Sequence, residues 1–171
     1  MDIVIVPFFE EATSSQVMRS VCDIDSNVFG EGNGWNESNF LVELPGKKQL
    51  SYLAFSGKEI AGYLIGSSYK SETGQNAHIN RIASNPESGR KGTGSELVRK
   101  FEASATELGC RAATLEFDSK LNVAGFYEKC GYLPVDQTDE ILKYVKAKSK
   151  ERIASEYTGL RRRIYKKDLL K

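Results

Sequence analysis

Segments rich in β-branched and aromatic residues divide the chain into predicted strands. Residues 2–9, DIVIVPFF, predict a first strand. Residues 49–69, QLSYLAFSGKEIAGYLIGSSY, predict two strands joined by a hairpin at SGKE. Four further segments are predicted as strands: NAHINRIAS at 76–84, RAATLEF at 111–117, YLPV at 132–135 and LRRRIYKKDLL at 160–170.

Apolar residues at helical spacing predict helices between these strands. The clearest pattern lies in residues 92–109, where five apolar side chains fall on one face: Leu97, Val98, Phe101, Ala105 and Leu108. A shorter helix is predicted at 122–130, with Asn122 as its N-cap and Gly131 closing it. Further helices are predicted at 11–29, 35–44 and, as a charged amphipathic segment, 138–156.

The order of these elements predicts the fold class. A strand, two helices, three strands, a helix, a strand, a helix and a strand follow one another without repeats or a low-complexity linker. Alternation of this kind is typical of a mixed α/β sheet covered by helices on both faces. We therefore expect one domain over residues 1–171.

A glycine-bearing turn, GRKGTGSEL at 89–97, precedes the clearest helix. Glycines allow successive N–H groups to converge on an anion, and the helix that follows directs its positive end to the same place. A diphosphate is the ligand that suits this turn. The turn lacks the Lys-Ser/Thr of a nucleoside-triphosphate loop, and Leu97 stands where a dinucleotide fingerprint requires Gly or Ala.

Together with NVAGFYEKCGY at 122–132, this turn resembles the GNAT superfamily of acetyl-CoA-dependent N-acetyltransferases. The superfamily's second motif, N-x-x-A-x-x-[FL]-Y-E-K-x-G-[FY], is matched, with Ala124 one place early, at Asn122, Phe126, Tyr127, Glu128, Lys129, Gly131 and Tyr132. FGEGNGWNESNFLVEL and YLAFSGKEIAGYLIG are similar to the acceptor-side loop, helix and hairpin of the branch that acetylates protein amino termini. The resemblance covers about Ile3 to Val135; residues 136–171 are less clearly matched.

The resemblance implies a mostly antiparallel sheet with a splayed cleft for acetyl-CoA, which is a cosubstrate. It implies that the backbone of Ile82, Ala83 and Ser84 contacts the pantetheine arm, with Asn122 nearby. It also implies that the turn binds the diphosphate through Gly89, Arg90, Lys91, Gly92, Thr93, Gly94 and Ser95. Gly89 stands where the family has Arg or Gln, so the backbone N–H groups are expected to carry most of this contact.

Acetyl transfer to an amine needs a proton acceptor for the amine and a proton donor for the leaving thiolate. By resemblance, Tyr127 directs its hydroxyl at the thioester sulfur and is the candidate general acid; the alternative is an aromatic core residue. His78, the sole histidine, is a candidate base or a hydrogen-bonding residue within the sheet. Glu116 competes for the same role, acting through water, or is an exposed strand residue.

Alternation along the strand at 76–84 places His78 and Asn80 on one face and Ile79 and Arg81 on the other. Trp35 could wall the acceptor pocket or anchor the helix that follows. Three acids could attract a cationic amine or be solvated: Asp23, Asp25 and Glu31.

The composition limits which binding partners and metal sites are expected. The 171 residues carry a net charge of +1, a poor fit to a nucleic-acid binder. One histidine and three scattered cysteines predict no metal site and reduced thiols, with Cys130 a small core residue. The first residues read as a strand rather than a signal peptide, and no segment suits a membrane span. We expect a cytoplasmic enzyme, monomeric or homodimeric.

Two hypotheses follow. The first is an N-acetyltransferase that moves an acetyl group to a primary amine without a covalent enzyme intermediate. Its acceptor is either a protein or peptide amine or a small molecule, and Thr138–Glu156 could cap the acceptor cleft and favour the small molecule. The second is a non-catalytic acyl-CoA-binding or sensing module on the same fold.

Overall fold

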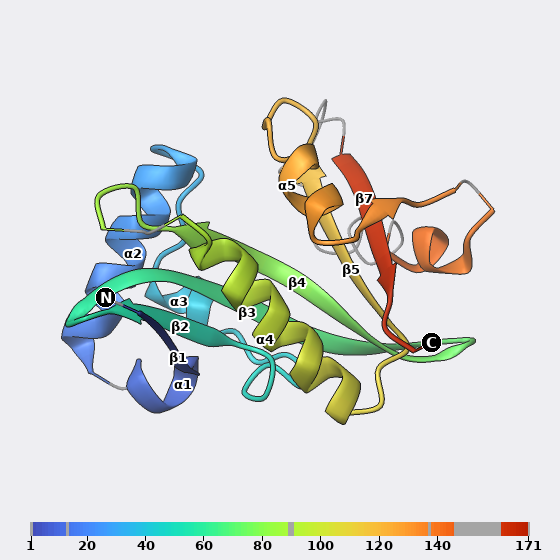
Figure 1. Ribbon diagram of the computed structural model, residues 1–171, viewed down its shortest axis with the longest axis horizontal. Helices are drawn as coiled ribbons and strands as arrows, with labels where there is room; N and C mark the ends of the chain where they lie inside the picture. The colour runs from blue at the N-terminus through green and yellow to red at the C-terminus, as the bar shows by residue number, and fades with distance from the viewer. Residues whose placement is uncertain (1, 13, 89–90, 137, 146–161, 171) are drawn as a thin grey trace.

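The computed structural model describes residues 2–12, 14–88, 91–136, 138–145 and 162–170. Its seven strands form one sheet in the order β1-β2-β3-β4-β5-β7-β6 (Figure 1). The strands are β1 (Ile3–Pro7), β2 (Tyr52–Ser56), β3 (Glu59–Ser71), β4 (Gly74–Ser84), β5 (Ala112–Asp118), β6 (Leu133–Pro134) and β7 (Arg162–Asp168). The helices are α1 (Phe8–Glu11), α2 (Ser15–Phe29), α3 (Glu37–Leu41), α4 (Thr93–Glu107) and α5 (Ala124–Lys129), and residues 140–145 are also helical.

Five of the six strand pairs are antiparallel, and the β4–β5 pair is parallel. The prediction of a mixed, mostly antiparallel sheet is therefore confirmed. Among the described residues no helix is long and apolar enough to cross a membrane.

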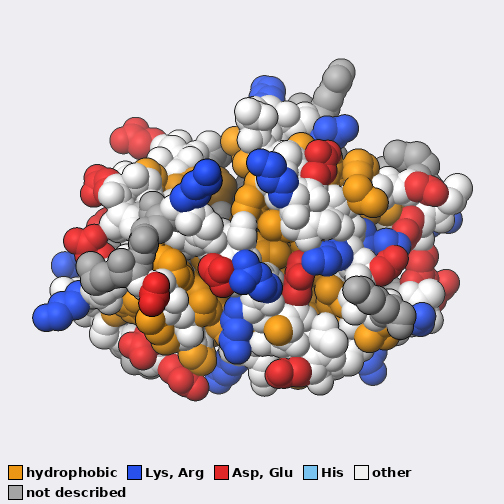
Figure 2. Space-filling view, viewed as in Figure 1, with side chains coloured by type: hydrophobic (Ala, Val, Ile, Leu, Met, Phe, Trp, Pro, Cys, Tyr) orange, Lys and Arg blue, Asp and Glu red, His pale blue; other side chains and the backbone are white. Residues whose placement is uncertain are grey.

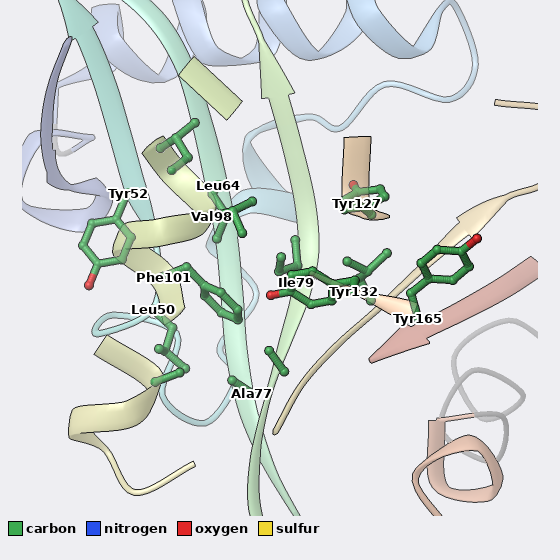
Figure 3. Packing of buried hydrophobic residues seen from close by; sticks show 14 of the residues in the cluster. Leu50, Tyr52, Leu64, Ala77, Ile79, Val98, Phe101, Tyr127, Tyr132 and Tyr165 are labelled. Atoms are coloured by element: carbon green, nitrogen blue, oxygen red, sulfur yellow. The ribbon is translucent and has the colours of Figure 1, made fainter. Parts of the chain in front are cut away.

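Side chains alternate between the two faces of the sheet, and each face is covered by different helices. Along β3, Leu64 points to the face of α4, whereas Tyr63 and Ile65 point to the face of α1, α2 and α3. The core under α4 is continuous from β2 to β7, since it contains both Tyr52 and Tyr165 (Figure 3).

The opposite face carries two separate cores. One lies under α1–α3, over β2, β3 and the end of β4. The other lies under the 140–145 helix, where five buried residues pack together: Ala112, Ile141, Leu142, Val145 and Ile164. This division leaves the middle of that face, over β4 and β5, between two covered regions.

Local signals set the helix ends. Ser14 caps α2, its side chain accepting a hydrogen bond from the Val17 N–H at 3.2 Å. Gly92 precedes α4 with φ of 98°, a left-handed conformation that favours glycine. In α5 the prediction of Asn122 as the N-cap is wrong. Val123 occupies that position, no side chain of a described residue caps the helix, and Asn122 is exposed.

Three other element boundaries differ from the predictions. The first strand ends at Pro7 and Phe8 begins the short helix α1, which packs its buried ring against Phe40 of α3. The strand predicted at 132–135 is reduced to Leu133–Pro134. Of the helix predicted at 138–156, residues 140–145 are helical, and 146–156 lie outside the described residues.

The close approach of β3 to α4 depends on Gly66. A Cβ at this position would lie 2.6 Å from Cε2 of Phe101, a ring in the continuous core. We expect Gly66→Ala to lower the free energy of unfolding by about 1–3 kcal/mol, because extra volume in a packed core forces side chains out of place. Urea denaturation measures this change.

Gly125→Ala is the matched control for this prediction. A Cβ at Gly125, on the exposed side of α5, meets no atom within 4 Å. This variant should equal the parent or gain up to about 1 kcal/mol from helix propensity. Equal midpoints for the two alanine variants would contradict the close packing at Gly66.

Candidate functional site

The sheet opens between β4 and β5. These strands pair only through Ala77–Ala113, His78–Thr114 and Ile79–Leu115. Beyond Ile79, β4 continues to Ser84 paired with β3 alone, and the two strands diverge toward their carboxyl ends (Figure 1). In the described part of the chain no strand pairs with this edge of β4, so its backbone groups are available to a ligand.

A β-bulge in β4 lies where the strands begin to part. Ile79 pairs with Gly66 and Arg81 pairs with Ile65, so Asn80 is the extra residue. The Asn80 side chain donates a hydrogen bond to Ser67 Oγ at 2.8 Å. Bulges bend a strand and re-aim its side chains. This bulge therefore contributes to the divergence of β4 from β5.

The bulge also changes which face Arg81 occupies. Strict alternation predicted Arg81 on the face opposite His78, and that prediction is wrong. Arg81 ion-pairs with Asp25 of α2, while His78 bonds to Thr114 and lies beside Tyr69. The extra residue resets the alternation, so the side chains of His78 and Arg81 share one face of the sheet.

The glycine turn lies at the same end of the sheet as the opening. Gly92 accepts the Glu96 N–H through its carbonyl, and the first N–H groups of α4 have no intrahelical acceptor. Thr93 is buried, Gly94 and Ser95 are half-buried and Lys91 is exposed. The other two residues predicted to bind the diphosphate, Gly89 and Arg90, lie outside the described residues.

The start of α4 lies beside α5 across the opening. A Cβ on Gly94 would come within 3.0 Å of Phe126 Cζ and 3.7 Å of Ser84 Oγ. Gly94 therefore permits α4, α5 and the end of β4 to meet. Among the other predicted donor-side residues, Ile82 is half-buried and Ala83 is buried in the α2-side core.

Tyr127 of α5 is held by aromatic packing beside the opening. Its ring stacks on Phe117 of β5 at 5.6 Å between centroids and meets Tyr132 edge-on at 6.3 Å. Tyr127 belongs to the same core as Ile79, and Figure 3 shows both residues beside Tyr132 and Tyr165 in that core. Burial, with a smaller contribution from Cys130, raises the pKa of Tyr127 to about 12. The phenol is therefore protonated at neutral pH and can donate a hydrogen bond.

Polar side chains gather on the opposite face of β4 and β5. His78 Nδ1 lies 2.8 Å from Thr114 Oγ1, and the Tyr69 hydroxyl lies 2.9 Å from the same atom. Glu116 follows Thr114 by two residues, so it lies on this face, and it is half-buried. The two candidate bases thus lie on neighbouring strands. His78 is within the paired stretch and Glu116 is beyond it.

The 140–145 helix borders this polar face from the side of β7. Tyr144 stacks on Tyr69 with 4.7 Å between ring centroids. Glu140 accepts a hydrogen bond from Ser71 Oγ at 3.0 Å, at the β3–β4 turn. Sequence reasoning missed Tyr69 and Thr114 because their connection to His78 exists only once β3, β4 and β5 are side by side.

Figure 2 shows a hollow between the two halves of the molecule on the α4 side, lined by hydrophobic side chains and flanked by Lys and Arg. Within the described residues no group of three or more His, Cys, Asp or Glu side chains can hold a metal ion. The opening is thus apolar on the α4 side and polar on the other.

A model of the acetyltransferase (GNAT) family matches residues 18–132, which include both glycine-turn and α5 motifs. The chain belongs to the GNAT family of acetyltransferases. A search of curated protein sequences finds no significant match.

Several solved structures have a similar fold. Ard1 from Thermoplasma volcanium has a TM-score of 0.70 at 17% identity, with all of both chains covered. A chain of the NatC complex bound to Gag peptide and CoA has a TM-score of 0.67 at 14% identity, covering 99% of this chain and 100% of that one. The ribosomal-protein-S18-alanine N-acetyltransferase from Escherichia coli has a TM-score of 0.64 at 14% identity, covering 98% and 94%.

Proposed function

We propose that this GNAT protein transfers an acetyl group from acetyl-CoA to a primary amine, with the thioester in the opening between β4 and β5. The observation that carries the proposal is the opening itself. It has a protonated tyrosine on one side and a polar face with two candidate bases on the other. That arrangement supplies the proton donor and the proton acceptor that aminolysis of a thioester requires.

The donor side of the opening suits coenzyme A. The N–H groups at the start of α4, together with Gly92–Ser95, provide a positive helix end for the diphosphate. The edge of β4 at Ile82–Ser84 offers backbone groups to the amide-bearing pantetheine arm, because β5 does not pair with β4 beyond Ile79. Asn122, exposed just before α5, borders the same arm.

Tyr127 is proposed to donate a hydrogen bond to the thioester sulfur and to protonate the departing thiolate. Its ring is fixed by Phe117 and Tyr132, and its hydroxyl makes no hydrogen bond to another described residue. The hydroxyl is thus available for a ligand in the opening. The amine attacks the carbonyl directly, since a deprotonated amine is itself a good nucleophile.

Glu116 is the better placed of the two candidate bases. It lies beyond the last β4–β5 pair, where the strands have parted, and it is half-buried. His78 is 9% exposed, and its Nδ1 is hydrogen-bonded to the Thr114 hydroxyl. We assign proton abstraction from the amine to Glu116, directly or through water, and a supporting role to His78.

The acceptor is proposed to be the amino terminus of a protein or peptide. Two of the structurally similar proteins support this choice, one named for a ribosomal-protein alanine and one bound to a peptide. The 140–145 helix favours the alternative, a small amine, because it covers one border of the polar face.

A thiol-release assay tests the activity. Purified protein is incubated with acetyl-CoA and either peptides with free amino termini or small amines such as amino sugars and polyamines. Amine-dependent release of free thiol is expected, with the peptides as the better group. Acetyl-CoA binding without release on any amine would support a non-catalytic acyl-CoA sensor. Failure to bind acetyl-CoA would overturn the proposal.

Tyr127→Phe tests the acid. The variant keeps the ring that stacks on Phe117, so acetyl-CoA affinity should stay within about twofold while kcat falls about 100-fold. Because the pKa of Tyr127 is raised to about 12, ionisation of this residue should cause no loss of rate up to about pH 10 in the parent. Steady-state thiol-release rates of the parent and the variant, measured from pH 7 to about pH 10, check both the loss of kcat and the pH profile. An unchanged kcat in the variant would remove Tyr127 from the mechanism.

Glu116→Gln and His78→Gln separate the two candidate bases. We expect Glu116→Gln to lower kcat/KM at pH 7 about 100-fold, and the deficit to shrink toward pH 9. The reason is that an α-amino group has a pKa of about 8, so at the higher pH it is already neutral and needs no base to remove its proton. His78→Gln should lose less than about fivefold. The reverse order of losses would transfer the role to His78.

A further inference from the structure

A carboxylate with no exposure to solvent lies under the loop that joins α2 to α3. Asp25 of α2 is 0% exposed, contrary to its reading as a solvated or amine-attracting acid. Arg81 of β4 donates to both of its oxygens, Nε to Oδ1 and Nη2 to Oδ2, each at 2.8 Å. Tyr63 donates its hydroxyl to Oδ1, and the Trp35 N–H donates to Oδ2 at 2.5 Å.

The other contacts of Arg81 go to the same loop. Its Nη2 also donates to the Asn33 carbonyl at 2.7 Å. Its Cζ lies 3.5 Å from the ring centroid of Phe29 and 5.1 Å from that of Trp35. One guanidinium therefore binds the end of α2 and two residues of the 30–36 loop at once.

The loop has little conformational preference of its own. It contains Gly30, Gly32 and Gly34, and the first two have φ of 83° and 82°. Trp35 packs against the core over β2 and β3, and the described hydrogen bonds that connect the loop to the sheet run through Asp25 and Arg81. An isolated buried ion pair contributes little net stability compared with apolar residues of the same size. The Asp25–Arg81 ion pair is therefore better explained by the conformation that it imposes on a glycine-rich loop.

The position of Arg81 relates this loop to the reaction. Arg81 follows the bulged Asn80 directly and shares the face of His78, past the last residue that pairs with β5. The 30–36 loop therefore borders the polar face from the α2 side, opposite the 140–145 helix. Trp35, half-buried in this loop, contacts Phe40 of α3 edge-on at 5.2 Å.

We propose that Asp25 and Arg81 are positioning residues that hold the 30–36 loop as the acceptor-side wall of the cleft and thereby set the affinity for the amine. This inference rests on the proposed acetyltransferase function. Neither residue touches the reacting atoms, because Asp25 is buried beneath Arg81 and the guanidinium faces α2 and the loop. The effect should therefore appear in acceptor binding rather than in the chemical step.

Trp35 is the sole tryptophan of the chain, so its fluorescence reports on this loop in the absence of any substrate. In Asp25→Asn, which keeps the shape of the side chain and removes its charge, the Trp35 emission should shift to longer wavelength and acrylamide should quench it more. Asp23→Asn, an exposed carboxylate two residues away on α2, is the matched control and should leave both readings unchanged.

Kinetics on the best amine of the panel give the second readout. In Asp25→Asn the acceptor KM should rise at least about tenfold, while acetyl-CoA affinity and kcat stay within about threefold. Arg81→Lys keeps the charge but loses the paired hydrogen bonds, so its KM should be intermediate. If Asp25→Asn does not fold, Arg81→Lys tests the same effect on the acceptor KM.

The double variant Asp25→Asn/Arg81→Gln removes both charges of the ion pair. Its thermal stability should recover relative to the single variant, whereas its acceptor KM should stay high, because the loop has lost its geometry. Recovery of KM together with stability would overturn the positioning role. So would an unchanged Trp35 emission, an unchanged acceptor KM, or an equal loss for both substrates. If no amine releases thiol, the proposed function fails, and the fluorescence still decides whether the ion pair holds the loop.

Discussion

The parting of β4 from β5 after Ile79 governs the rest of this molecule, because a sheet that opens in its middle exposes backbone groups that would otherwise be paired. Such an opening persists only if each half is held by contacts that do not depend on the missing pairs. The continuous core under α4 and α5 holds the two halves together on one face. On the other face, the halves have separate cores under α2 and under the 140–145 helix.

This asymmetry gives the two sides of the opening different chemistry. The α4 side is apolar, and the Tyr127 phenol lies in a stack of aromatic rings that keeps it protonated. The far side is polar, since among the described residues no single core covers β4 and β5 there. Thr114 connects His78 and Tyr69 on that side, and Glu116 lies one step further along β5. A reaction that needs a donor and an acceptor of protons on opposite sides fits this division.

The sequence predicted what depends on local periodicity and missed what depends on the sheet. The helix at 92–109 was predicted within two residues of its observed ends, because five apolar residues repeat at helical spacing and glycines flank it. The bulge at Asn80 carries no local signal, since it is defined by its pairing with β3. Missing the bulge placed Arg81 on the wrong face. Asp25 was misread for the same reason, because its partner lies 56 residues away in the chain.

The two substrates of the proposed reaction also differ in what the sequence reveals about them. A diphosphate bound by backbone N–H groups at a helix start needs glycines and a helix, and both are visible in a short motif even with Gly89 in place of Arg or Gln. An acceptor wall built from a pliable loop depends on a side-chain contact between distant segments. Arg81 makes that contact from β4, the strand whose free edge is proposed to bind acetyl-CoA. The acceptor wall and the free edge of β4 therefore depend on the same strand, which only the assembled sheet reveals.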